Sequence, residues 1–372
     1  GARDRGTVAA FRSEALITGL LNHPSIVPVH ELIERNDGGT AFPMKQVSGH
    51  SWFELLHPHG ESARKKAKSL TLENHLDILM SVCQAVAYAH QHGIIHRDIK
   101  PSNVMVGDFG EVLLMDWGMG ISFRSPPPLP EILGRESVKA PLGSPGYMAP
   151  EMTVPRGDDL GPWTDIYLLG AVLYEILTGK MPHQGNSLFE VIRCAYESGP
   201  KEFPEDAPEE LIAVCNRAMA RTPSQRFASV EDFREAIRTF LRHRESHVLV
   251  ESAHRRMKTV GGVEKSSDGE RANRTKNHGR YEALADALAG FRQAQVLWSG
   301  NPKAIEGERR ARLAWAKAAL ATGDLGLARS QLEGLSDPES NELSRSIDRA
   351  RDLEKRKQRQ VLRLRVVIAT AL

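Results

Sequence analysis

The sequence is poor in cysteine and has no long apolar run. Its three cysteines, Cys83, Cys194 and Cys215, lie far apart in apolar contexts within 372 residues. This excludes a small disulfide-stabilised secreted domain, and we predict buried free thiols in a reducing compartment. A transmembrane helix needs about 20 consecutive apolar residues. No stretch of that kind is present, and neither is a signal peptide.

The sequence also lacks a large excess of either positive or negative charge. Lys and Arg number 49 and Asp and Glu 47, which gives a net charge of +2. This balance implies neither a nucleic-acid partner nor a strongly acidic one. With 41% hydrophobic and 26% charged residues, the composition is that of an ordinary soluble protein, long enough to bury cores in two or more domains.

One stretch concentrates chemically distinct side chains at fixed spacing: residues 96–103, His-Arg-Asp-Ile-Lys-Pro-Ser-Asn. Asp98 can accept a proton from a hydroxyl nucleophile, Lys100 can stabilise phosphoryl oxygens, and Asn103 offers a neutral oxygen to a hard cation. Arg97 remains available to hold a phosphate on a regulatory loop. These are the tasks of phosphoryl transfer, in which the protein mainly positions groups and neutralises charge.

The pattern H-R-D-x-K-x-x-N resembles that of the eukaryotic-like, or Hanks-type, serine/threonine protein kinases of bacteria. The resemblance implies an α+β kinase-like fold with a partial small lobe and a complete, mainly helical large lobe, followed by an all-α repeat-like region. It implies ATP and Mg²⁺ as cofactors and proteins with Ser or Thr as substrates. It also makes His96 a packing and hydrogen-bonding residue.

The family has a second magnesium ligand after a β-hairpin, and two aspartates compete for this role. Residues 107–110 spell the usual Asp-Phe-Gly after a glycine, but they follow the first loop too closely and also suit a tight turn. Asp116 comes directly after the apolar residues 112–115. We therefore predict Asp116 as the metal ligand and Asp108 as part of the turn, with Trp117 in the place of the usual Phe.

Further segments match the family in the same order. Residues 143–151, Gly-Ser-Pro-Gly-Tyr-Met-Ala-Pro-Glu, resemble the substrate-side loop, with Ser144 where a hydroxyl is bonded to the catalytic Asp and Lys. The resemblance makes Asp165 the acceptor of backbone N–H groups from the catalytic loop and Arg226 the partner of Glu151. Each residue alone has an ordinary explanation, such as a helix cap or a surface charge. Their joint order and spacing do not.

The N-terminal part resembles a fragment of the small lobe. Apolar spacing over residues 11–21 predicts the regulatory helix, with Glu14 as the partner of a strand lysine that holds phosphates. Residues 40–49 resemble the strand that enters the adenine hinge, with Met44 as both gatekeeper and core. The backbone expected at the adenine edge is that of Lys45, Gln46 and Val47.

Neither a glycine-rich phosphate loop nor a V-A-x-K motif occurs before Glu14. We therefore expect the chain to begin inside the small lobe. These elements supply much of the phosphate positioning, so we expect the chain as given to be weak or inactive as an enzyme.

An insert with four prolines in five residues, 126–130, precedes the substrate-side loop. Its prolines favour polyproline II, and we interpret it as a stiff exposed loop, with a docking peptide for a proline-reading domain as the alternative. Ser137 is our candidate for regulatory phosphorylation. It lies seven residues before Ser144, close enough for a phosphate to reach Arg97. The other serines available are Ser122 and Ser125.

The composition changes after the kinase-like region, and we divide the chain accordingly. Small residues at helical spacing, with breaks after residues 298 and 321, resemble tetratricopeptide repeats, and a generic helical hairpin is the alternative. A protein partner could bind these helices. The predicted regions are 1–242 (kinase), 243–279 (helical extension and polar linker, with a second break at 278–279), 280–336 (repeat-like helices) and 337–372 (basic tail).

The tail is basic and then apolar. Between residues 355 and 365 it carries six Lys and Arg and no acid, and residues 366–372 are almost wholly apolar. Seven residues cannot span a bilayer, which needs about 20. We expect the first part of a membrane helix that begins near Val366 and continues beyond Leu372, which would anchor a cytoplasmic kinase domain to the inner membrane. An amphipathic tail is the alternative.

Together these features predict a bacterial serine/threonine protein kinase that transfers the γ-phosphoryl group of ATP to protein hydroxyls. The alternative is a pseudokinase or scaffold that binds partners through the kinase fold and the repeat-like helices. Four side chains suited to the reaction, at working spacing, argue against a scaffold. They are Asp98, Lys100, Asn103 and Asp116.

Overall fold

The computed structural model describes residues 5–29, 31, 33–34, 40–199, 201–261 and 270–371. The chain forms two compact units, Gly1–Phe240 and Leu241–Leu372. Each is described by itself.

The first unit begins with helix α1 (Arg5–Leu20), which includes the helix predicted over residues 11–21. Its inner face carries Ile17, which is fully buried. Two short strands follow, β1 (Ile33–Glu34) and β2 (Thr40–Ala41), paired antiparallel.

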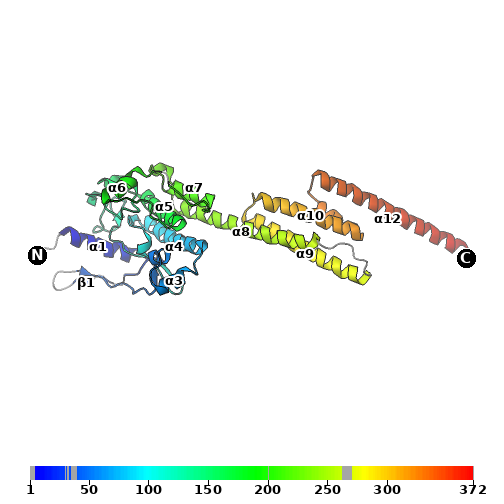
Figure 1. The fold of residues 1–372 in the computed structure, drawn as a ribbon, viewed down its shortest axis with the longest axis horizontal. Coiled ribbons are helices and arrows are strands. Elements are labelled where there is room, and N and C mark those ends of the chain that lie inside the picture. The colour runs from blue at the N-terminus through cyan, green and yellow to red at the C-terminus, as the bar shows by residue number, and fades with distance from the viewer. Residues whose placement is uncertain are drawn as a thin grey trace. The chain divides into compact units, whose positions relative to one another are not determined.

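The regular structure of the first unit is mainly helical (Figure 1). Helix α4 (Leu72–Gln91) begins at the capping box of Thr71 and ends before Gly93, whose φ of +81° suits glycine. Helix α5 (Pro162–Thr178) is buried from Thr164 to Glu175 and packs against α4 and α7. The remaining helices are α2 (Trp52–Leu56), α3 (Glu61–Ala67), α6 (Leu188–Glu197), α7 (Glu209–Ala218) and the start of α8 (Val230–Gly261).

Short strands position the candidate site. Strands β3 (His50–Ser51), β5 (Val104–Val106) and β6 (Val112–Leu114) form an antiparallel sheet in the order β3-β5-β6. A second pair joins β4 (Ile94–Ile95) to β7 (Ile121–Ser122). Residues 96–103 therefore run from β4 into β5, and Asp116 follows β6.

The turn between β5 and β6 is confirmed at residues 107–110. Gly107 and Glu111 are paired across it, with Gly107 N donating to Glu111 O at 2.8 Å. Phe109 at its tip is 98% exposed. The Asp-Phe-Gly spelled by these residues therefore lacks the packed aromatic that the family motif would have.

Two expectations about packing are wrong. Met44 is 45% exposed and not core, because it lies in an isolated bridge to Val29 beside very short strands. Cys194 is only half-buried on α6, whereas Cys83 and Cys215 are buried; all three are free.

The proline insert is an exposed loop, as expected: residues 124–130 form neither helix nor strand, and all but Pro127 are exposed. It bends at residues 124–126 and again at 128–129, so it is not a straight polyproline II segment.

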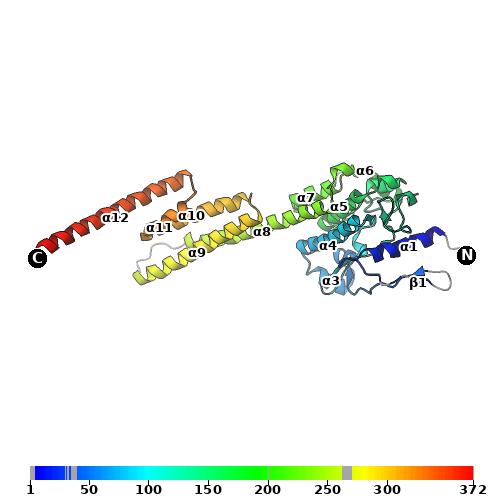
Figure 2. The ribbon, with the colours of Figure 1, turned by 180° about the vertical axis from the view of Figure 1, so that it is seen from behind.

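The second unit is all-helical. Its helices are the remainder of α8, α9 (Glu270–Leu297), α10 (Pro302–Thr322), α11 (Leu325–Leu332) and α12 (Pro338–Ala371). Helix α10 packs against both α9 and α11, as Figures 1 and 2 show. Three predicted helical segments are thus confirmed. The expected break at residues 278–279 is wrong, because one internal glycine costs a helix only about 1 kcal/mol; residues 262–269 lie outside the described part.

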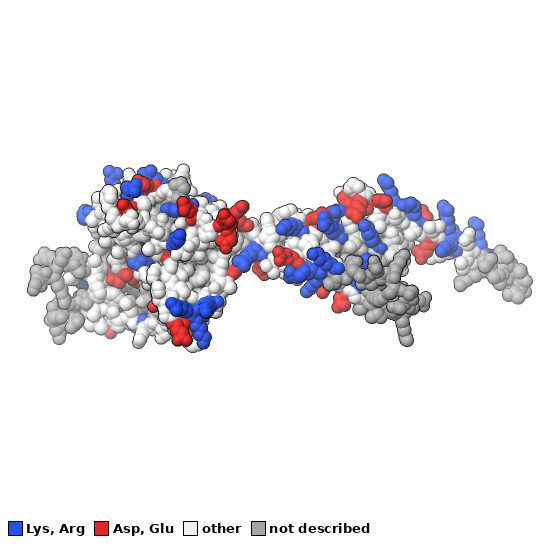
Figure 3. Space-filling model, viewed as in Figure 1, with Lys and Arg blue, Asp and Glu red and all other residues white. Residues whose placement is uncertain are grey.

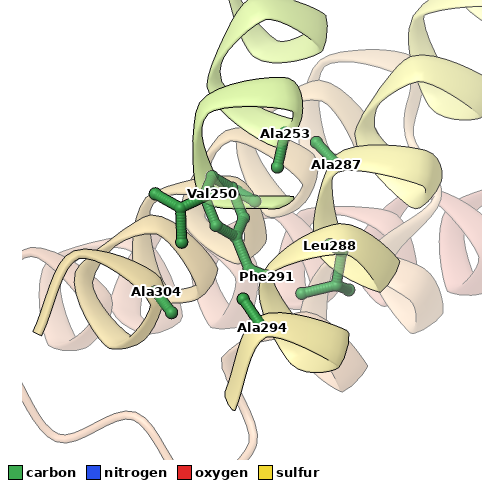
Figure 4. Close-up of a cluster of buried hydrophobic side chains, with 8 residues drawn as sticks. Val250, Ala253, Ala287, Leu288, Phe291, Ala294 and Ala304 are labelled. Carbon is green, nitrogen blue, oxygen red and sulfur yellow. The ribbon is translucent and has the colours of Figure 1, made fainter. Parts of the chain in front are cut away.

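Small and aromatic side chains form the core of this unit. Phe291 of α9 is fully buried and points among Val250 and Ala253 of α8 and Ala304 of α10 (Figure 4). A Cβ on Gly307 would lie 2.3 Å from the Phe291 ring, so the glycine permits close approach of α10 to α9. Small residues therefore set the distance between these helices.

Two side-chain interactions stabilise the connection from α9 to α10. Asn301 is fully buried, caps α10 through its side-chain oxygen, and donates from Nδ2 to Ser246 Oγ at 2.9 Å. Trp298 stacks on His243 with ring centroids 4.2 Å apart. The tryptophan thus packs between helices.

The far part of α12 stands apart from this core. Residues 351–361 are all exposed, and Figure 3 shows Lys and Arg side chains along this stretch. Among the described residues, no helix is both long enough and apolar enough to cross a membrane, α12 included.

Replacing the buried ring tests the core of the second unit. Phe291→Ala should lower the free energy of unfolding by about 3–5 kcal/mol, because it removes a large buried side chain and leaves a cavity. Urea unfolding measures the loss, and hydrogen exchange should locate it in α9 and α10. Val296→Ala on the same helix, where Val296 is 77% exposed, is the control and should change the free energy by less than about 0.5 kcal/mol.

Candidate active site

A buried carboxylate at the start of α5 holds the loop of residues 96–103. Asp165 is fully buried and accepts hydrogen bonds from His96 N at 2.8 Å, Arg97 N at 2.9 Å and His90 Nε2 at 2.8 Å. Burial raises the pKa of Asp165, but the interactions with His90 and the backbone N–H of Arg97 outweigh it, so the pKa is lowered overall. The bonds fix Arg97 at a φ of +67°, a costly conformation for this residue.

His96 has both ring nitrogens in fixed hydrogen bonds. Asp98 N donates to Nδ1 at 3.2 Å, so Nε2 carries the proton and donates to Met115 O at 3.2 Å. Burial lowers the pKa of His96, which keeps the ring neutral. The ring packs on Trp117, with centroids 4.5 Å apart. No ring nitrogen remains for proton transfer to a substrate.

Three side chains form a closed hydrogen-bonded triangle. Lys100 Nζ lies 2.7 Å from Asp98 Oδ2 and 2.7 Å from Ser144 Oγ, and Ser144 Oγ donates to Asp98 Oδ1 at 2.7 Å. Asn103 Nδ2 donates to the backbone O of Asp98 at 2.9 Å and to Oδ2 at 3.0 Å. The Asp98 carboxylate is therefore held from three sides, and the amide oxygen of Asn103 is left as the atom that could coordinate a cation.

The two residues predicted to hold metal flank neighbouring strands, because Asn103 directly precedes β5 and Asp116 follows β6. Met115 N donates to Asn103 O at 2.9 Å, which places Asp116 next to the end of the loop. Asp116 is exposed, has a φ of +60°, and accepts from Gly118 N at 3.3 Å. Asp108, in contrast, lies on the turn, where its contact is Lys66 at 3.5 Å.

These oxygens suit magnesium. Mg²⁺ usually takes one or two carboxylates or neutral oxygens from the protein and the rest from water and substrate phosphates. Among the described residues, no group of three or more His, Cys, Asp or Glu side chains could hold a metal without such help. The set formed by Asn103 and Asp116 therefore fits an ion that arrives with a nucleotide.

Glu14 of α1 lies close to this set. It is half-buried, and its Oε2 approaches the same face of Gly118 as Asp116 Oδ1 does. Burial and then the charge of Asp116 raise the pKa of Glu14. The charged group that acts on Glu14 is thus the carboxylate of Asp116, whereas the family pattern predicts a lysine as its partner. A cation between the two acids would relieve their repulsion.

The substrate-side segment is anchored by a buried ion pair. Arg226 is 3% exposed and donates from Nη1 and Nη2 to the two oxygens of Glu151 at 2.7 and 2.8 Å. It also donates to the backbone O of Trp163 and of Ala220. The pairing expected from the sequence is present with bidentate geometry.

A cavity of about 290 Å³ lies beside the loop, with Arg97, Ser137 and Lys139 on its lining. Arg97 Nε is buried without a hydrogen-bond partner among the described residues, and burial lowers the pKa of this guanidinium. Ser137 Oγ donates to Gly134 O at 2.6 Å. One hydroxyl and two cations therefore share this cavity.

The predicted hinge residues lie on the exposed segment that leads to β3. Lys45 N donates to Pro28 O at 3.4 Å, and the residues from Lys45 to Gln46 are exposed, with Val47 half-buried. The structure gives no contact between this segment and the triangle around Asp98. Its role at the adenine edge stays a prediction.

Sequence reasoning missed two groups of polar residues. His90 bonds to Asp165; it continues the apolar stripe of α4 four positions after Val86, which could have revealed it. His57 bonds through Nε2 to the buried Glu175 at 2.7 Å. Nothing in the sequence signals that second contact, because the residues are 118 positions apart.

The family follows from comparison with known proteins. A family model described as the protein kinase domain matches residues 2–239. The chain belongs to the protein kinase domain family. The relatives that match this kinase chain include serine/threonine-protein kinase PknB of Mycolicibacterium smegmatis, 33% identical over 244 residues, which cover 63% of this chain and 36% of the relative.

Two further relatives agree. PknB of Mycobacterium leprae is 33% identical over 242 residues, 63% of this chain and 36% of its own. Serine/threonine-protein kinase PknD of Protochlamydia amoebophila is 30% identical over 256 residues, 63% of this chain and 26% of its own. The chain thus spans about a third of the length of the PknB relatives, and the match to the family model lies within its first unit.

The buried carboxylate gives a pH-dependent prediction. At pH 7, Asp165→Asn should lower the free energy of unfolding by about 3 kcal/mol, because buried donors lose a charged acceptor. The pKa of Asp165 is lowered in the folded state, so its contribution is present above about pH 4, the unfolded value, and is lost as the pH falls through the folded value.

Urea unfolding from pH 7 to pH 3 checks this. The gap between wild type and Asp165→Asn should narrow in acid, and a gap that stayed constant would contradict the assignment. Asp158→Asn, at an exposed neighbouring carboxylate, is the control and should stay within about 0.5 kcal/mol of wild type.

Proposed function

We propose that the protein is a serine/threonine protein kinase that transfers the γ-phosphoryl group of ATP to Ser or Thr hydroxyls of other proteins in bacterial signalling. The observation that carries the proposal is the triangle of Asp98, Lys100 and Ser144, with all three distances at 2.7 Å. The names of the relatives, which are serine/threonine-protein kinases, support the same reaction.

Each residue has a task in this proposal. Asp98 accepts the proton of the substrate hydroxyl, since its carboxylate is held at the centre of the site. Lys100 neutralises charge on the phosphoryl oxygens, and Ser144 orients both side chains from the substrate side. The protein mainly positions groups, which is what phosphoryl transfer requires.

Asn103 and Asp116 would hold Mg²⁺, which, when bound, neutralises charge on the phosphates of ATP. Glu14 would face the same phosphates from α1, and the backbone of Lys45, Gln46 and Val47 would meet the adenine edge, next to Met44. The neighbouring carboxylates of Glu14 and Asp116 support a cation at this place.

The second unit would bind a protein partner, with α9, α10 and α11 arranged as tetratricopeptide-like helices. The packing of α10 against both neighbours supports a repeat-like arrangement. The cationic, exposed residues 351–361 would lie near an anionic membrane surface and hold the kinase domain at the cytoplasmic side.

Removing the base tests the proposed reaction. Asp98→Asn should lower kcat by about 10²–10⁴-fold, because an amide cannot accept the proton. Transfer of radiolabelled phosphate from Mg-ATP by the full-length protein is the measurement. Wild-type rates from Asp98→Asn would refute the role.

Asp108 and Asp116 are each followed by an aromatic residue and a glycine, so variants at the two positions form a matched comparison. Asp116→Asn should abolish Mg²⁺-dependent transfer and the nucleotide-induced rise in melting temperature, because it removes the charged metal ligand. Asp108→Asn, on the exposed turn, should leave both unchanged. The opposite result would make Asp108 the ligand.

We also propose that a phosphate on Ser137 binds Arg97 and orders the segment before Ser144. The shared cavity and the unpartnered Arg97 Nε support this. Ser137→Ala should lower kcat about tenfold, the scale of a typical regulatory coupling, whereas Ser125→Ala should not. Phosphopeptide mapping of active enzyme checks it, and an unmodified Ser137 would end the hypothesis.

A further inference from the structure

A second cavity, of about 690 Å³, lies beside the turn that carries Ser144. Gly146 lines it, and the next two residues are tied to Ser144, since Tyr147 N and Met148 N donate to Ser144 O at 2.9 and 3.1 Å. His183 N donates to Gly146 O at 3.2 Å, which joins another part of the lining to this turn. A chain bound at the cavity would therefore pass close to the triangle around Asp98.

The lining is apolar and basic. Phe53, Met181 and Val191 supply apolar surface, and Met181 is 41% exposed. Among the described residues that line the cavity there is no Asp or Glu. The ionisable side chains on it are His57, His59, Lys180 and His183. Burial lowers the pKa of His183 to about 3, so that ring is neutral and Lys180 supplies the positive charge.

A carboxylate is nevertheless present behind this lining. Glu175 at the end of α5 is 0% exposed; its Oε1 is 2.7 Å from His57 Nε2, and its Oε2 is 2.7 Å from the Tyr147 hydroxyl. Burial and then the charge of Glu175 raise the pKa of Tyr147, so the phenol stays protonated and donates. An ionised carboxylate only accepts, so His57 Nε2 donates as well. Both oxygens are thus already bonded within the protein.

We propose that His57 is a specificity-determining residue for the protein substrate. By donating to Glu175 it withholds that carboxylate, and it leaves a lining that takes an acidic substrate side chain and rejects a basic one. The inference rests on the proposed kinase function and adds the class of substrate.

The charges explain the direction of the preference. A basic side chain entering the cavity meets Lys180 and can reach the carboxylate of Glu175 only by displacing His57, which is 27% exposed and hydrogen-bonded. An acidic side chain in the cavity would instead lie near Lys180 and near His57 and His59, which also line the cavity. Selection therefore works by repulsion of one charge as well as attraction of the other.

The test uses the full-length protein and peptides that share one Ser and differ only in having Asp, Gln or Arg at each position around it. At one or more positions wild type should phosphorylate the Asp peptide with a kcat/KM about tenfold above that for Arg, the scale of one surface ion pair gained and one lost. His57→Ala should reverse this order, because Glu175 becomes available to the Arg side chain.

Two variants control the result. His59→Ala removes a neighbouring lining residue that does not touch Glu175, and it should keep the wild-type order. His57→Ala combined with Glu175→Gln should lose the gain for the Arg peptide, because the uncovered group is no longer charged. Melting temperatures show that each variant is folded. A folded His57→Ala protein that retains the wild-type order would overturn the inference.

Direct binding separates this inference from the proposed function. Fluorescence anisotropy measures the affinity of the same labelled peptides without turnover. Absence of phosphate transfer from every protein would defeat the kinase proposal, while tighter binding of Asp than Arg peptides, reversed in His57→Ala, would still support the cavity. Equal binding of both peptides by wild type, with or without transfer, would overturn it.

Discussion

The site depends on one buried carboxylate. Asp165 accepts two backbone N–H groups from adjacent residues, His96 and Arg97, and so dictates the path of the chain into the catalytic loop. A backbone held only by its own preferences would not place Arg97 at positive φ. Because α5 is buried along most of its length, the carboxylate is fixed by the core of the first unit. The packed helices thereby determine where Asp98 lies.

From this point the site is built by hydrogen bonds between segments that are distant in sequence. Lys100 and Asn103 come from the same loop as Asp98, but Ser144 comes from another, and Met115 N ties the following strand to Asn103. The Asp98 carboxylate accepts hydrogen bonds from Lys100, Asn103 and Ser144. These donors stabilise its negative charge. The same amide that orients Asp98 leaves its oxygen for a cation, which would couple the placement of the proposed base to that of the proposed metal.

The sequence predicted these positions well because they form dense local patterns. The turn at 107–110 and the pair of Glu151 with Arg226 follow from spacing, glycine placement and a family pattern. Predictions failed where the answer depends on what covers a residue. Met44 is exposed because the strands beside it are too short to bury it. Gly279 remains helical because the rest of the 28-residue helix α9 stabilises it. The bond between His57 and Glu175 depends on tertiary packing alone, which no local pattern encodes.

The ion pair between Glu151 and Arg226 also affects how this part of the chain unfolds. It joins residues 75 positions apart, and both partners are buried, so neither can open to solvent without leaving an uncompensated charge. The ion pair closes the chain between Glu151 and Arg226, which includes α5, into a loop. It thus acts as a reversible, non-covalent cross-link. Partial opening of the substrate-side segment is therefore tied to opening around α5, and these elements form one cooperative unit.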